Sequence, residues 1–181
     1  MAVETVQPRQ NALLCAALLA AGRPLTGSEL GQLLSGGAAA VPAAITGLQE
    51  ALNEAQLGLI IEQVAGGYRL VVDPKLTPDL AGLLAPPPLP RLSNAALETL
   101  ALVAYRQPVT RGELEAARGA SCSSTLETLQ ERELVKVVGQ RDVIGKPLLW
   151  GTTERFLIEF GLKSIDELPP LEELETGFLR G

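Results

Sequence analysis

In the first half of the chain, helical spacing of apolar residues gives way to short apolar runs after residue 58. Residues 13–21 place Leu13, Leu14, Ala17, Leu18 and Ala21 on one helical face, and Gly22 ends that element. A second helix is expected over residues 27–34. A third, over residues 42–56, spaces Ile45, Leu48 and Leu52 three and four residues apart. Residues 59–64 and 68–72 are predicted to be two strands joined by a glycine turn.

The second half of the chain repeats this order of elements. Its first helix, capped by Ser93, carries Leu97, Leu100, Ala101 and Ala104. The next follows Thr110 and ends at Gly119, and a third spans residues 121–132. Residues 135–138 and 147–150 are predicted to form a hairpin. A last helix, capped by Thr152 or Thr153, carries Phe156, Leu157 and Phe160.

One seven-residue motif occurs in both halves. Residues 24–30 (PLTGSEL) align without a gap to residues 108–114 (PVTRGEL). In each copy Thr precedes Glu by three residues, which is the spacing of a capping box, where hydroxyl and carboxylate accept hydrogen bonds from free amides at a helix start. The same helix, turn and helix start is therefore predicted twice.

Three helices followed by a hairpin are the order of a winged helix-turn-helix domain. The sequence thus predicts an α+β fold of tandem winged helix-turn-helix domains, mainly helical with small hairpin wings. The predicted domains are residues 10–85 and 92–163, separated by a proline-rich linker, 86–91, with a tail at 1–9 and an acidic flexible tail at 164–181. The alternative is an unrelated α+β domain with coincidental capping boxes.

The composition excludes most catalytic chemistry. The chain has no histidine and two cysteines, Cys15 and Cys122. His-based catalysis, imidazole metal sites and thiolate cages are therefore excluded. No Walker or dinucleotide-type glycine loop is present. Cys122 lies between serines near a helix start, where a lowered pKa is conceivable, but it has no partner base. We expect no enzymatic activity and no cofactor.

Charge argues against strong DNA binding. The net charge is −6; residues 1–85 carry 4 basic and 7 acidic side chains, residues 91–165 carry 10 and 9, and residues 166–181 carry 1 and 5. The third helix of each half is acidic and lacks early basic side chains suited to base contacts.

The second hairpin is the element best suited to touch DNA. It offers Lys136, Arg141 and Lys146 as possible weak contacts to a DNA backbone. The alternative is a solvated strand edge protected by charge. Direct DNA binding is expected to be weak or absent.

The longest apolar run, residues 12–21, is too short for a membrane span, which needs about 20 residues. It corresponds to the helix that begins near Ser93, so we expect it to be core. With two cysteines and no targeting segment, a cytoplasmic location without membrane association is expected.

Several segments of the second half together resemble one family. They are residues 92–101 (LSNAALETLA), 104–114 (AYRQPVTRGEL), 118–119, 145–153 (GKPLLWGTT), 156–157 and 160–162. In this order they are similar to segregation and condensation protein B (ScpB), the accessory subunit of the bacterial SMC–kleisin complex. The first half resembles the family through its element order and residues 24–30. The chain departs from the family pattern at Glu133, where glycine is usual, and at Ala120 and Trp150.

The resemblance implies a non-catalytic adaptor needed for chromosome condensation and segregation in cell division. It implies homodimerisation through the first domain and wrapping of the central segment of the kleisin (ScpA type) by both domains, with the second as the kleisin-contact domain. The kleisin links the protein to SMC at the nucleoid. Tyr105, Arg111, Leu148 and Trp150 are candidate partner contacts, since Tyr, Trp and Arg are enriched at binding hot spots; for each, core packing or a capped turn is the alternative.

Two other functions compete with the adaptor. One is a winged-helix transcription regulator that binds DNA directly, and the other is a small-molecule sensor with a cleft between the halves. The spaced leucines of the acidic tail also permit docking on a groove.

Overall fold

The computed structural model describes residues 6–84 and 92–170. The chain divides into two compact units, residues 1–88 and 89–181, and we describe each by itself. The division falls within the predicted linker, 86–91, which itself lies outside the described residues.

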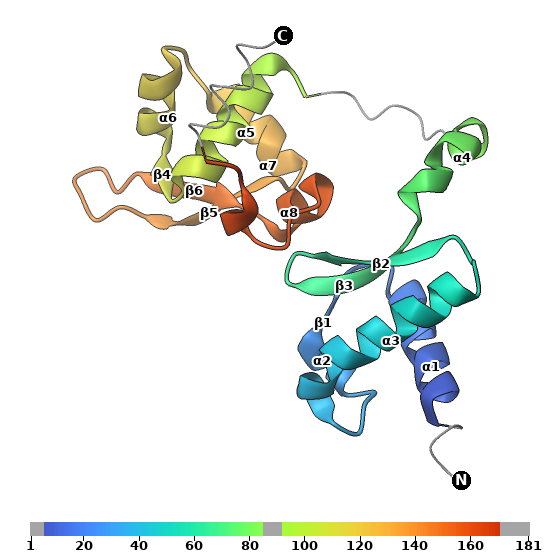
Figure 1. The fold of residues 1–181 in the computed structure, drawn as a ribbon. Coiled ribbons are helices and arrows are strands. Elements are labelled where there is room, and N and C mark those ends of the chain that lie inside the picture. The colour runs from blue at the N-terminus through green and yellow to red at the C-terminus, as the bar shows by residue number, and fades with distance from the viewer. Residues whose placement is uncertain (1–5, 85–91, 171–181) are drawn as a thin grey trace. The chain divides into compact units, whose positions relative to one another are not determined.

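The first unit combines helices with a three-stranded antiparallel sheet (Figure 1). Its elements are α1 (Val6–Ala21), β1 (Leu25–Thr26), α2 (Gly27–Gly31), η1 (Gly37–Ala40), α3 (Val41–Glu54), β2 (Leu59–Val64), β3 (Gly67–Val72), η2 (Pro74–Leu76) and α4 (Thr77–Leu84). The strand order is β1-β3-β2, with Leu25 opposite Tyr68 and Leu59 opposite Val72.

The core of this unit lies between the helices and one face of the sheet. It contains Leu14 and Leu18 of α1, Leu30 of α2, and Ile45, Leu48 and Leu52 of α3. Leu59, Ile61, Tyr68 and Leu70 pack against it from the sheet. The helical faces predicted for residues 13–21 and 42–56 are therefore buried at these positions, while Leu13 is exposed.

Two boundaries in the first unit differ from expectation. Helix α1 begins at Val6, inside the segment predicted to be a tail. Helix α2 ends at Gly31 instead of residue 34, because the chain turns there and η1 returns against it. A Cβ on Gly31 would lie 2.4 Å from the backbone nitrogen of Ala38, so only glycine permits this approach.

The second unit repeats the same order (Figure 1). Its elements are α5 (Asn94–Arg106), β4 (Val109–Thr110), α6 (Arg111–Arg118), α7 (Ser123–Glu131), β5 (Val135–Gln140), β6 (Leu148–Thr152), α8 (Glu154–Phe160) and η3 (Ile165–Glu167). The sheet order is β4-β6-β5, all antiparallel. The core joins Leu100 and Val103 of α5, Leu114 of α6, Leu126 and Leu129 of α7, Trp150 and Phe156.

The helix starts follow the predicted caps. In both capping boxes the Thr hydroxyl accepts from the Glu amide and the Glu carboxylate accepts from the Thr amide, at 3.2 and 2.8 Å for Thr26–Glu29 and 3.3 and 2.9 Å for Thr110–Glu113. Ser93 caps α5 and Thr153, rather than Thr152, caps α8. Gly119 ends α6 in the left-handed conformation.

The prediction of a flexible tail from residue 164 is wrong for its first seven residues. Ile165 and Leu168 pack against the core of the second unit, and the Tyr105 hydroxyl donates a 2.7 Å hydrogen bond to the Pro169 carbonyl. The Glu167 carboxylate also accepts from the Lys163 amide at 2.7 Å. Apolar contacts and hydrogen bonds together therefore hold this acidic stretch against the second unit. Residues 171–181 lie outside the described residues.

The α+β fold class is confirmed, since both units mix helices with small antiparallel sheets. Strands β1 and β4 were not expected. Each lies in the turn before a capping-box helix and pairs with the second strand of the hairpin in its unit, β1 with β3 and β4 with β6. No helix in the described residues is long and apolar enough to cross a bilayer.

Candidate functional site

The outward surface of α1 is apolar. Its exposed residues Ala12, Leu13, Ala16, Leu19 and Ala20 fall within about a third of the helix circumference at about 100° per residue. Leu19 is 71% exposed. Leu14 and Leu18, on the opposite side, enter the core.

A helix that is apolar on both faces is normally covered on both faces. Helix α1 has no charged residue after Arg9 and no polar side chain other than the thiol of Cys15 after Asn11, so nothing else in residues 12–21 suits contact with water. We call Ala12, Leu13, Ala16, Leu19 and Ala20 the α1 outer face. It is a candidate surface for protein association.

The second unit has a groove between α5 and α6. Helix α5 contributes Glu98, Ala101, Leu102, Tyr105 and Arg106, spaced so that all lie on one side of the helix. Helix α6 contributes Ala117 and Arg118. This α5–α6 groove has a volume of about 510 Å³ and is lined by both apolar and charged side chains.

Arg118 is the most constrained side chain in the α5–α6 groove. It is only 8% exposed, and its guanidinium donates to the Ser121 carbonyl at 3.2 Å and to the Glu98 carboxylate at 3.5 Å. Its Nε is buried and no described group accepts a hydrogen bond from it. A buried donor without an acceptor costs free energy in the folded protein.

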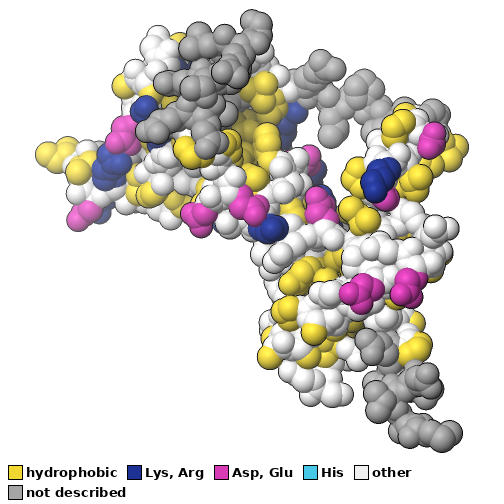
Figure 2. Space-filling view, viewed as in Figure 1, with side chains coloured by type: hydrophobic (Ala, Val, Ile, Leu, Met, Phe, Trp, Pro, Cys, Tyr) yellow, Lys and Arg dark blue, Asp and Glu magenta, His cyan; other side chains and the backbone are white. Residues whose placement is uncertain are grey.

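The β5–β6 hairpin carries exposed apolar side chains. Val143 and Ile144 lie in the loop between the strands, and Ile144 is completely exposed. Val138 and Leu148 are exposed on the strands that lead to this loop. Figure 2 shows hydrophobic side chains gathered at the free end of the hairpin. Charged side chains, among them Asp142 and Lys146, lie beside these apolar ones, so the tip offers apolar area for protein contact within a charged surround.

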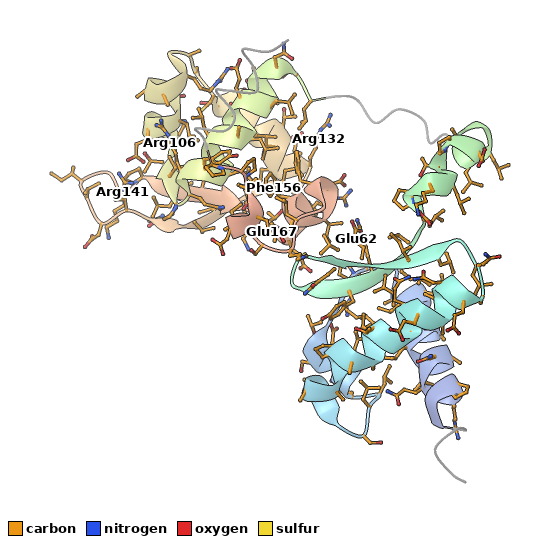
Figure 3. All side chains as sticks on the ribbon, viewed as in Figure 1. Glu62, Arg106, Arg132, Arg141, Phe156 and Glu167 are labelled. Carbon is orange, nitrogen blue, oxygen red and sulfur yellow. The ribbon has the colours of Figure 1, made fainter. Side chains whose placement is uncertain are left out.

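Arg141 connects the hairpin to α6. Its guanidinium forms a two-pronged pair with the carboxylate of Glu113, at 2.7 and 3.1 Å, and Figure 3 shows Arg141 on the hairpin beside the start of that helix. The hydrogen bonds from Arg141, followed by those from Thr110, lower the pKa of Glu113 from 4.5 to about 2. Arg141 therefore has a carboxylate partner already, whereas no carboxylate in the described residues pairs with the exposed Lys136 or Lys146.

The structure separates the four candidate partner residues. Tyr105 is half-buried in the α5–α6 groove. Arg111 is exposed at the start of α6, 3.8 Å from the Glu115 carboxylate. Its guanidinium also donates to the Ser123 hydroxyl of α7 at 3.4 Å, whereas Leu148 is exposed on β6. Trp150 is 9% exposed in the core, so it offers little surface, and its partner contact stays a prediction.

The third helices carry the charge that their sequences suggested. Helix α3 contains Glu50 and Glu54 and no basic residue. Helix α7 contains Glu127 and Glu131, and Arg132 follows it as the C-cap. Neither helix offers a cation at its N-terminal end for base contacts.

The reactive-thiol possibility for Cys122 is wrong. The thiol is completely buried, and desolvation, followed by the nearby Glu115 charge, raises its pKa. Its sulfur lies 4.0 Å from the Arg111 carbonyl, as expected for a structural side chain. Within the described residues, no three His, Cys, Asp or Glu side chains gather as a metal site requires.

Sequence reasoning missed two polar side chains that organise the second unit. The Gln107 side-chain oxygen accepts from the Thr152 amide at 2.7 Å and from its hydroxyl at 3.1 Å, joining the end of α5 to β6. Arg118 was missed as a groove residue. The motif at 104–114 contains Gln107, but no local pattern distinguishes it from a surface glutamine.

Comparison with known proteins shows the family of this chain. The family model for segregation and condensation complex subunit ScpB matches residues 12–171. Segregation and condensation protein B of Moorella thermoacetica is 45% identical over 157 residues, covering 87% of this chain and 80% of that protein. The homolog from Coxiella burnetii is 45% identical over 165 residues, covering 88% and 77%.

A solved structure is also similar. ScpB from Mycobacterium tuberculosis is 32% identical, covers 86% of this chain and 97% of that chain, and gives a TM-score of 0.40. With the family match spanning almost the whole chain and relatives at 45% identity, this protein belongs to the ScpB family of segregation and condensation complex subunits.

Proposed function

We propose that the protein is a non-catalytic adaptor of the bacterial SMC–kleisin complex. In this proposal it is built from two winged-helix modules, dimerises through the first, and binds the central segment of an ScpA-type kleisin with the second. It acts in the cytoplasm at the nucleoid, in chromosome condensation and segregation during cell division.

The α1 outer face is the observation that carries this proposal. Leu13 and Leu19 are exposed on a helix that has no charged residue between Arg9 and Arg23. A second copy of the same helix would cover this face with an equally apolar surface, as an isologous dimer requires.

The second unit supplies surfaces for a different partner. The α5–α6 groove presents Tyr105 and Arg106, the start of α6 presents Arg111, and β6 presents Leu148. Tyr and Arg are common binding hot spots, and the exposed leucine adds apolar area. These surfaces support binding of an extended or helical segment of the kleisin.

Light scattering after gel filtration tests the proposal. We expect the protein alone to have twice the 19.1 kDa mass of one chain, and the mixture with a kleisin central fragment to give a 2:1 complex. Leu19→Glu should produce a monomer, because it buries a charge in the dimer interface. Leu57→Glu is the matched control, since Leu57 is also exposed in the first unit but lies off α1. A monomeric wild type, or no kleisin complex at micromolar concentration, would contradict the proposal.

A winged-helix transcription regulator remains the second candidate. It is favoured only by Lys136 and Lys146, which are exposed on the hairpin. Fluorescence anisotropy with duplex DNA tests it: sequence-selective binding that survives physiological salt and is lost in Lys136→Glu would favour the regulator over the adaptor.

A further inference from the structure

We propose that the α5–α6 groove is the docking site of this chain's own C-terminal segment, residues 171–181, which binds there in cis. The inference concerns a segment that begins where the family match ends, at residue 171. It joins three independent features: the path of the chain, the charge of the groove, and the sequence of the segment.

The described chain ends beside the groove. Residues 164–170 fold back onto the second unit, held by Ile165, Leu168 and the hydrogen bond from Tyr105 to the Pro169 carbonyl. Tyr105 itself lines the α5–α6 groove. The segment after Pro170 therefore starts next to this groove without having to cross the molecule.

The length of the remaining chain is sufficient. From Glu98 to Arg106 the groove runs along eight residue steps of α5, or about 12 Å at about 1.5 Å per residue. The eleven residues from 171 to 181 reach about 36 Å when extended and about 16 Å when helical. Either conformation spans the groove.

The charges are complementary. The segment contains Glu172, Glu173 and Glu175 against a single Arg180. Among the residues that the structure describes, no carboxylate forms an ion pair with Arg106, which lines the groove. Arg118 has a distant partner at 3.5 Å and a buried Nε without an acceptor in the described residues. A carboxylate from the segment can pair with the exposed Arg106 without displacing any described partner.

The apolar residues of the segment also fit. Leu171, Leu174 and Phe178 recur at spacings of three and four, with acidic residues between them. Ala101 and Leu102 form an apolar floor of small and medium side chains that such residues can cover. Because the proposed partner contact Tyr105 lies in the same groove, the segment would compete with a partner there. That consequence alone rests on the proposed function.

Limited proteolysis of the full chain tests the docking without any partner. A glutamate-specific protease cuts after Glu172, Glu173 and Glu175, and mass spectrometry measures release of the C-terminal fragment. If docked molecules outnumber undocked ones by about ten to one, the segment is cut about tenfold more slowly than the free synthetic peptide 171–181. This is because only the undocked molecules are cleaved. Cleavage of the wild type at the peptide's rate would overturn the proposal.

A pair of charge reversals locates the docking site. Arg106→Glu should raise the cleavage rate to nearly that of the free peptide, whereas Lys136→Glu, the same reversal at an exposed position on the hairpin, should leave it unchanged. Trp150 fluorescence confirms that both variants are folded. Equal effects of the two reversals, or none from either, would show that the groove is not the site.

A binding measurement adds a second, opposite readout. In the full chain carrying Leu174→Asp and Phe178→Asp, the groove should be vacant and should bind a fluorescein-labelled peptide of residues 171–181. The wild type should bind it at least tenfold more weakly, since its own segment is present at a high effective concentration. Equal binding to both proteins, or binding to neither, would contradict the proposal.

Discussion

Leu30 and Leu114 occupy equivalent positions in the two repeats, and both are completely buried. Each follows its capping-box Glu directly, and each belongs to a separate core. Leu114→Ala should therefore destabilise the second unit and leave the first unchanged, and Leu30→Ala should do the reverse.

The magnitude follows from the atoms removed. Leu→Ala deletes three carbon groups, worth about 0.8 kcal/mol each, or about 2.4 kcal/mol in transfer free energy. A residual cavity of about 50 Å³ adds about 1 kcal/mol at about 24 cal/mol per Å³. The expected loss in free energy of unfolding is about 3–4 kcal/mol. With a urea m-value of about 1–1.5 kcal/mol/M, the midpoint moves down by about 2–4 M.

The single tryptophan makes this measurable for one unit at a time. Trp150 lies in the second core, so its fluorescence reports unfolding of that unit, while far-UV circular dichroism reports both. At fixed protein concentration, Leu114→Ala should shift the fluorescence midpoint and Leu30→Ala should not. If Leu30→Ala shifted the fluorescence midpoint as much as Leu114→Ala, the separation of the two cores would be refuted. If Leu114→Ala left the midpoint unchanged, the burial of Leu114 would be refuted.

Three further predictions concern single side chains in the second unit. Glu133 has a φ of 59° at an exposed position, a left-handed conformation that strains a residue with a side chain. Glu133→Gly should therefore raise the free energy of unfolding, measured by urea titration, by about 1 kcal/mol. A loss of stability would contradict this. Because the pKa of Glu113 is lowered to about 2 in the folded state, its pairing with Arg141 stabilises the protein above pH 4.5 and is lost towards pH 2. The difference in free energy of unfolding between the wild type and Glu113→Gln should therefore disappear as the pH falls over that range. A difference that stays constant with pH would refute the pairing. Thiol titration at pH 8 should modify the half-buried Cys15 in the native protein and Cys122 only after unfolding, since Cys122 is buried and its pKa is raised; rapid reaction of both would contradict this.

The elements that sequence reasoning located best are those with local causes. The capping boxes at Thr26 and Thr110 start helices because hydroxyl and carboxylate lie within four residues of the amides they bind. Gly119 stops α6 for an equally local reason, its left-handed backbone. Apolar spacing also marked the buried residues of α3.

Predictions failed where the cause lay elsewhere in the chain. Leu97 and Ala101 share a predicted apolar face with Leu100, but both are exposed, and Ala101 lines the groove because α6 packs beside it. Strand β4 has only two residues, and exists because β6 offers a partner. Residues 164–170 were predicted to be free because their composition is acidic, yet the core of the second unit accepts Ile165 and Leu168.

The sequence by itself determined the repeat, the helix starts and stops, the α+β class and the family, because each depends on residue types at short, fixed spacing. The tertiary structure alone decided which apolar residues face outward, that Arg141 serves Glu113, and that Arg118 is buried beside Tyr105 in a groove. These features depend on contacts between residues far apart in the chain, and the free energy of such contacts has no signature in local sequence.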